Sequence, residues 1–167
     1  MDAQRGRRQK EISLRQEEKI ASDIGGRTVA GSGAARSSGG SDVRKKGEYR
    51  VEAKYTEAQF YSIKLSELEK LRVEAAKGGA EQPVFQIGFK RPATRHLLCF
   101  AVLPWHDVLL LDYPGFSWIR WYADKKSIRF YYSDARYCGE NEGIILRFSS
   151  GERFYIISWS RFLEETQ

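Results

Sequence analysis

The hydrophobic pattern of the first residues predicts a charged arm followed by a helix. Residues 1–12 are rich in Arg and Lys and lack apolar periodicity, so we expect a basic N-terminal arm there. Residues 13–24 predict a helix with Ser13 as its N-cap, and Gly25-Gly26 indicates its end. At helical spacing, one carboxylate and three apolar residues lie on the same face of this helix: Glu17, Ile20, Ala21 and Ile24.

Alternating polar and apolar positions then predict strands on either side of a second helix. One strand is expected to begin at Asp42-Val43, and the next spans 49–55, where Arg50, Glu52 and Lys54 share one face. A capping box that begins at Ser66 predicts a helix ending at Lys77. Apolar runs at 83–89 and 97–103 predict core strands. The strand–helix–strand order over 49–89 is typical of a βαβ unit.

The pattern changes beyond residue 104. A short helix over 105–111 is expected, followed by strands near 116–122, 127–133, 143–148 and 153–158, which short connections predict to be antiparallel. The chain is therefore predicted to be α/β, with a mixed central β-sheet flanked by helices and a C-terminal antiparallel β-rich extension. We expect a basic arm over 1–12, a core over 13–112 and an aromatic region over 113–167.

Composition narrows the functional classes. Residues 1–54 carry 13 Lys or Arg and 8 Asp or Glu, a net charge of +5 against +6 for the whole chain, which favours a phosphate-rich partner. The sequence contains neither a long apolar run nor an apolar N-terminus, so no membrane span or secretory signal is expected. Cys99 and Cys138 do not form a ligand-spaced set with His96 and His106, which indicates reduced cysteines in a cytoplasmic protein.

Four polar residues have the chemistry of a magnesium site. Asp42 and Glu52 offer hard oxygen ligands, the carbonyl of Ala53 another, and Glu17 completes the set if its helix packs beside the strands. Lys54, on the face of Glu52, is suited to position a water molecule or balance developing charge. Each feature also has a simpler interpretation. Glu17 could lie at the rim of the apolar stripe of its helix, in contact with water. Arg50, Glu52 and Lys54 could form a solvent-facing strand surface.

The combined layout resembles a known superfamily. Gln16-Glu17, Gly31-Ser32-Gly33-Ala34, Ser41-Asp42 and Glu52-Ala53-Lys54 are similar to the motifs of PD-(D/E)XK nucleases, and within them to phage-encoded and archaeal Holliday junction resolvases. Ser41 departs from the pattern, which has proline there. The resemblance implies a restriction-endonuclease-like, mixed five-stranded sheet, Mg²⁺ or Mn²⁺, a homodimer, and Ser32 near the scissile phosphate. It also implies four-way DNA junctions as substrate, in the cytoplasm of a bacterial or phage-infected cell.

Basic residues around the predicted site are expected to bind DNA phosphates: Arg27, Arg36, Arg44, Lys45 and Lys46. Three alternatives remain open. The chain is a less selective recombination or restriction nuclease, or a non-catalytic DNA-binding module with a degenerate nuclease fold. In the third, aromatic residues of the C-terminal region stack on bases rather than forming a core: Trp118, Trp121, Tyr131 and Tyr132.

Overall fold

The computed structural model describes residues 2–29, 42–90, 97–105, 117–123 and 126–166. In chain order the elements are α1 (Asp2–Ile24), β1 (Arg27–Thr28), β2 (Val43–Lys45), β3 (Tyr49–Thr56), β4 (Phe60–Lys64), α2 (Leu65–Lys77), β5 (Gln82–Lys90), β6 (Leu97–Pro104), β7 (Ser117–Ala123), β8 (Ser127–Tyr131), the 3₁₀ helix η1 (Tyr132–Tyr137), β9 (Glu142–Phe148), β10 (Arg153–Ser158) and α3 (Trp159–Glu165). Among the described residues, no helix combines the length and apolarity needed to cross a bilayer. Residues 106–111 of the helix expected over 105–111 lie outside this description.

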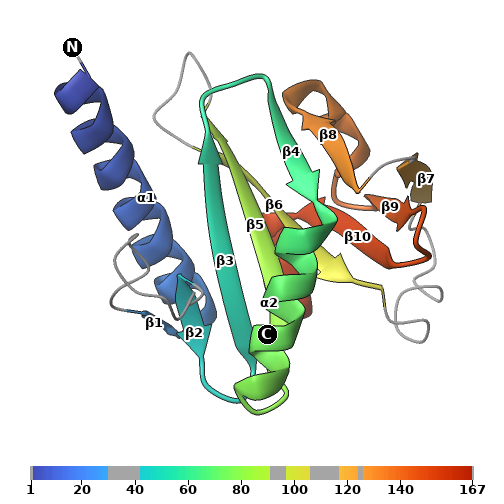
Figure 1. Ribbon diagram of the computed structural model, residues 1–167, viewed down its shortest axis with the longest axis horizontal. Coiled ribbons are helices and arrows are strands. Elements are labelled where there is room, and N and C mark those ends of the chain that lie inside the picture. The colour runs from blue at the N-terminus through green and yellow to red at the C-terminus, as the bar shows by residue number, and fades with distance from the viewer. Residues whose placement is uncertain (1, 30–41, 91–96, 106–116, 124–125, 167) are drawn as a thin grey trace.

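A mixed β-sheet organises the fold (Figure 1). Its strands lie in the order β1-β2-β3-β5-β6-β10-β9-β7, while β4 and β8 form a separate two-stranded sheet. β1, β2 and β3 form an antiparallel meander, and β3 runs parallel to β5 through the α2 connection. The α/β class, the mixed sheet and the βαβ unit are thus confirmed. The sheet is wider than the five strands implied by the resemblance, because β10, β9 and β7 continue it beyond β6.

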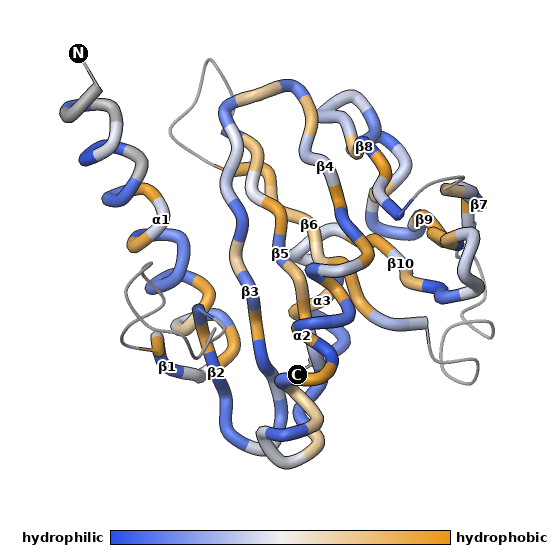
Figure 2. The backbone as a smooth tube through the Cα atoms, viewed as in Figure 1, coloured by the Kyte–Doolittle hydropathy of each residue, from blue (hydrophilic) through white to orange (hydrophobic). Residues whose placement is uncertain are grey.

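Helices cover both faces of the sheet, as alternation along β5 illustrates. Phe85, Ile87 and Phe89 point to one face, where they join the buried leucines of α2. Val84 points to the other face and belongs to the cluster that contains Ile20 of α1 and Phe162 of α3. Figure 2 shows apolar residues concentrated in these central strands. Each face therefore has its own core, and the central strands belong to both.

The first helix is longer than the sequence pattern predicts. α1 begins at Asp2, so the predicted N-cap at Ser13 is wrong, and residues 2–12 belong to the same helix. Ala, Gln, Arg, Lys and Glu are good helix formers, and a helix that extends beyond the core needs no apolar stripe. The predicted end is correct: Gly25 has a φ of 66°, and Gly26 N–H donates to the Ala21 carbonyl at 2.8 Å.

The second helix begins directly after a strand that was not predicted. β4 ends at Lys64, which is the N-cap of α2 and makes no side-chain capping bond. Ser66 is therefore inside the first turn, and the predicted capping box does not form. The predicted end at Lys77 is correct, because the N–H of Gly78 donates to the carbonyls of Glu74 and Ala75.

The C-terminal strands lie close to their predicted positions but pair differently. β7 and β9 run parallel, which contradicts the predicted antiparallel order. The reason is that β8 leaves the main sheet and pairs with β4, so β7 and β9 become neighbours through a crossover. β10 then lies between β9 and β6, antiparallel to both. The aromatic region over 113–167 thus shares its sheet with the preceding core.

Most of the aromatic residues considered for base stacking contribute to the core. Trp118 packs edge-on against Tyr155 with ring centroids 5.8 Å apart, and Trp121 packs against Phe130 at 6.3 Å. Tyr132 packs against Phe89 in the same manner. Tyr131 differs, with 39% of its surface exposed. Core packing therefore accounts for three of the four residues.

Candidate active site

The candidate site lies where β3 extends beyond the end of its neighbour β2. The ladder between these strands ends at the pair Val43–Val51, whereas β3 continues to Thr56. In Figure 1 β2 covers only one end of β3, and α1 stands beside the rest. Just beyond the ladder, a side chain accepts the hydrogen bond that a neighbouring strand would otherwise accept. Ala53 N–H donates to Oδ2 of Asp42 at 2.8 Å. This contact fixes Asp42 beside the E-x-K segment and satisfies a backbone donor on the open edge.

Glu52 and Lys54 are joined on one face of β3. Lys54 Nζ lies 2.5 Å from Glu52 Oε1, and about a quarter to a third of each side chain is exposed. Burial alone would lower the pKa of Lys54, but the hydrogen bond and charge of Glu52 outweigh it, with Asp42 and Glu67 adding to the effect. The net pKa of Lys54 is raised, so it is a cation at neutral pH and is unsuited to act as a general base.

Glu17 reaches the same edge from α1. Its pKa is raised to about 7, first by partial burial and then by the negative charges of Asp42 and Glu52, with a smaller effect from Glu18. Three carboxylates from separate elements are thus close enough to repel one another. The predicted helical phase needs a correction, because the buried stripe consists of Gln16, Ile20 and Ile24, and Glu17 is half-buried at its rim.

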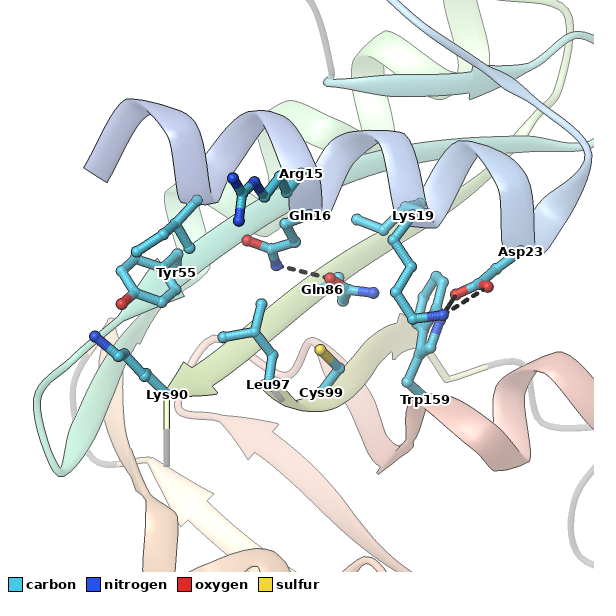
Figure 3. Close-up of a pocket in the computed structure, with 12 residues that line it drawn as sticks. Arg15, Gln16, Lys19, Asp23, Tyr55, Gln86, Lys90, Leu97, Cys99 and Trp159 are labelled. Carbon is cyan, nitrogen blue, oxygen red and sulfur yellow. Dashed lines mark hydrogen bonds and ion pairs between the residues drawn. The ribbon is translucent and has the colours of Figure 1, made fainter. Parts of the chain in front are cut away.

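A buried amide pair that sequence reasoning missed holds α1 against the sheet. Gln16 Nε2 donates to Gln86 Oε1 at 2.7 Å (Figure 3). It also donates to the Lys54 carbonyl at 3.3 Å. Gly88 makes room for this contact, since a Cβ there would lie 3.0 Å from Gln16 Nε2. The available signal was a glutamine inside the apolar run 83–89. Because Glu17 follows Gln16, this pair also sets where Glu17 can reach.

Beside the amide pair, α1, β5, β6 and α3 enclose a cavity of about 270 Å³ (Figure 3). Trp159 Nε1 donates to Asp23 Oδ2 at 2.9 Å across it, which joins α3 to α1. Cys99 lines the cavity as a free thiol whose pKa is raised to about 11, mainly by burial. Cys138 is also free and its pKa is raised to about 12 for the same reason. Neither cysteine has the character of a nucleophile at neutral pH.

The basic residues predicted to bind DNA have different environments. Arg44 is engaged in the structure, with its Nε 2.6 Å from Oε1 of the buried Glu81 and its Nη2 2.7 Å from the Gly78 carbonyl. Lys45 pairs with Glu48 at 2.6 Å. Lys46 and Arg27 are exposed. Two predicted residues, Ser32 and Arg36, lie outside the described residues, as does the glycine-rich segment around them.

Glu81 is a second residue that the sequence pattern did not single out. Arg50 Nε lies 3.0 Å from its Oε2, and Gly47 N–H lies 3.3 Å from its Oε1. Burial would raise the pKa of Glu81, but Arg44, Arg50 and the Gly47 N–H together lower it. This cluster closes the turn between β2 and β3 against the end of α2. Arg44 therefore has a structural role, whatever else it contacts.

The donor set at the edge of β3 suits a hard divalent cation. Among the residues that the structure describes, no three His, Cys, Asp or Glu side chains are grouped closely enough to hold a metal ion together. Mg²⁺ needs only one or two carboxylates together with water and a substrate phosphate. Asp42 and Glu52 meet that requirement, and Glu17 and the backbone of Ala53 lie beside them. The residues present therefore fit Mg²⁺ or Mn²⁺.

Comparison of the chain with protein-family models, with curated proteins and with solved structures finds no significant match.

Proposed function

We propose that this protein is a Mg²⁺-dependent DNA endonuclease of the PD-(D/E)XK type. The observation that carries the proposal is the convergence of Glu17, Asp42, Glu52 and Lys54 at the open edge of β3. These residues come from α1, from the start of β2 and from β3. Repulsion among three carboxylates raises the pKa of Glu17, and a bound divalent cation would relieve it.

The order of the elements supports the proposed superfamily. The chain runs α1, β1, β2, β3, α2, β5, with the strands side by side in the order β1-β2-β3-β5 and β5 parallel to β3. A helix, an antiparallel meander and a βαβ crossover suit a restriction-endonuclease-like core with the acidic residues on the meander. β4 and the strands beyond β6 are additions to such a core.

Each site residue has a defined chemical task in this proposal. Asp42 and Glu52 would hold the cation, with Glu17 and the Ala53 carbonyl as further ligands. The bound cation supplies a water molecule of lowered pKa and neutralises charge on the phosphate. Lys54 remains protonated beside Glu52 and stabilises negative charge that develops on the phosphate oxygens. Ala53 N–H keeps the Asp42 carboxylate oriented before the substrate binds.

The substrate that we propose is a four-way DNA junction, cleaved by a homodimer. A junction has near two-fold symmetry and needs matched nicks in opposing strands, so two copies of this site related by a dyad suit it. Lys46 and Arg27 lie exposed near the meander and would bind the flanking phosphates.

A cleavage assay tests this proposal. Purified protein with Mg²⁺ would be given an immobile four-way junction, a linear duplex and a single strand of the same sequences. Glu17→Ala is the informative variant and Glu18→Ala its matched control, because Glu18 is an exposed neighbour on the same helix. We expect symmetric nicks in the junction, lost in Glu17→Ala and retained in Glu18→Ala.

The other outcomes separate the alternatives. Cleavage of all three substrates would indicate a general nuclease of the same type. Tight DNA binding without cleavage in Mg²⁺ or Mn²⁺ would indicate a non-catalytic binding module. Equal activity of the two variants would contradict the assignment of Glu17 to the site.

A further inference from the structure

A hollow of about 270 Å³ lies on β10, β9 and β7. These strands form the end of the sheet opposite β1–β3 (Figure 1). We name this surface the Arg–aromatic face. Its lining includes three arginines and three aromatic side chains: Arg120, Arg147, Arg153, Trp105, Trp121 and Tyr122.

Strand register places the arginines together. Tyr122 pairs with Arg147, and Arg147 pairs with Arg153, so these three form one row across β7, β9 and β10. Residues directly opposite on neighbouring strands point to the same face. Arg120 is two residues before Tyr122 and therefore shares that face. The arrangement concentrates positive charge on a short stretch of sheet.

The Arg–aromatic face is accessible and cationic. Arg120, Arg147 and Arg153 are exposed, and 65% of the surface of Tyr122 is exposed. No carboxylate lines the hollow in the described parts of the chain, and there neither Arg120 nor Arg147 forms an ion pair. Guanidinium groups bind phosphate in a fork geometry, and exposed rings stack on bases. Both components match a nucleotide chain.

The hollow distinguishes between forms of nucleic acid. In a duplex the bases are stacked inside, and only the phosphates reach a flat cationic surface. A hollow bordered by aromatic rings instead accommodates an unstacked base. We propose that the Arg–aromatic face binds a single-stranded segment of DNA, with the arginines on its phosphates and Tyr122 stacked on a base.

This inference deepens the proposed function, since it takes DNA to be the ligand. β9 is separated from β3 by β5, β6 and β10, about 19 Å at the usual strand spacing. The Arg–aromatic face thus contributes affinity rather than chemistry. A DNA with an unpaired segment near the cleavage position can contact both places, which would favour branched substrates.

The test measures binding without divalent cations, so that it does not depend on cleavage. Fluorescence anisotropy with the full chain in EDTA would use a labelled oligothymidylate and a duplex of equal length. The variants are Arg120→Gln with Arg147→Gln, and separately Tyr122→Ala. The control is Arg72→Gln with Lys77→Gln, two exposed cations on α2. Thermal melting checks that all variants fold.

We expect the arginine double variant to weaken single-strand binding about tenfold or more and to flatten its salt dependence. Tyr122→Ala should weaken it at least about fivefold. The control variant should bind as the wild type does.

Three results would overturn the inference. They are absence of single-strand binding by the wild type, equal losses in the arginine and control variants, and equal losses for duplex and single strand. If the protein binds as expected but cleaves no DNA, the proposed nuclease function fails and the binding face stands.

Discussion

A single buried carboxylate, Glu81, and a group of three carboxylates lie at opposite ends of the β2–β3 hairpin, and their environments differ. Glu81 is fully buried, yet two arginines and a backbone N–H compensate its charge and its pKa is lowered. Glu17 is more exposed, yet its pKa is raised to about 7, first by partial burial and then by the charges of Asp42 and Glu52. Burial alone therefore does not distinguish them. What differs is the pairing that the described residues show: two arginines contact Glu81, whereas at the edge of β3 Lys54 pairs with Glu52 beside two further carboxylates.

The largest effect should come from removing a proposed ligand at the end that holds Glu17, Asp42 and Glu52. Asp42→Ala or Glu52→Ala should lower the cleavage rate about a thousandfold or more, while DNA binding is kept or becomes tighter because a negative charge is lost. Single-turnover kinetics and anisotropy measure the two quantities. Glu48→Ala, a change in an exposed turn residue, is the control. Near-normal nicking by either variant would refute the metal site.

The compensated end should instead control stability. Glu81→Ala leaves Arg44 and Arg50 without their buried partner. It should destabilise the fold by about 3 kcal/mol, because breaking a buried ion pair leaves buried charge without compensation. For a chain of this size the melting temperature should fall by roughly 6–12 °C. Cleavage per folded molecule should change little. A stable variant with lost activity would reverse the two assignments.

A divalent cation should stabilise the protein through Asp42 and its neighbouring carboxylates, and not through Glu81. Mg²⁺ at about 100 times its dissociation constant adds about 2.7 kcal/mol if it binds the folded state alone. The expected rise in melting temperature at pH 8 should disappear in Asp42→Ala and persist in Glu81→Ala. Scanning calorimetry with and without EDTA measures this difference. Equal rises in both variants would mean that the cation binds elsewhere.

The smallest effect concerns Glu17 without a cation. Its folded pKa lies above its unfolded value, so the folded state binds the extra proton and stability falls as pH rises from about 4.5 to about 7. Glu17→Gln removes this loss and should raise the melting temperature in EDTA at pH 8 by about 2–4 °C, corresponding to about 1 kcal/mol after solvent screening. At pH 4 the two proteins should melt alike. A larger gain at pH 4 would contradict the pKa shift.

Local signals in the sequence predicted much of the fold. Gly25-Gly26 ended α1, alternation located β3, and apolar runs located β5, β6, β9 and β10. Strand periodicity alone predicted that Glu52 and Lys54 share one face of β3. These features depend on neighbours along the chain, which is why they could be predicted.

The features that sequence reasoning missed depend on distant partners. The first half of α1 carries no amphipathic signal because it extends beyond the core. The pairing of β4 with β8, which makes β7 and β9 parallel, joins segments far apart in the chain. Gln16 and Gln86 are 70 residues apart, and Arg44 and Glu81 are 37 apart. A polar residue in an apolar run indicates that a partner exists but not which residue it is.

The place of β10 in the sheet affects how the protein is made. β10 is synthesised after β6 and β9, yet it lies between them and pairs with both. Until the ribosome has released residues 153–158, the hydrogen-bonding edge of β6 that will receive β10 stays open. Such an edge can pair with another nascent chain. Production of this protein should therefore benefit from slow expression or from a chaperone that covers strand edges, and nonsense mutations before β10 should yield insoluble fragments.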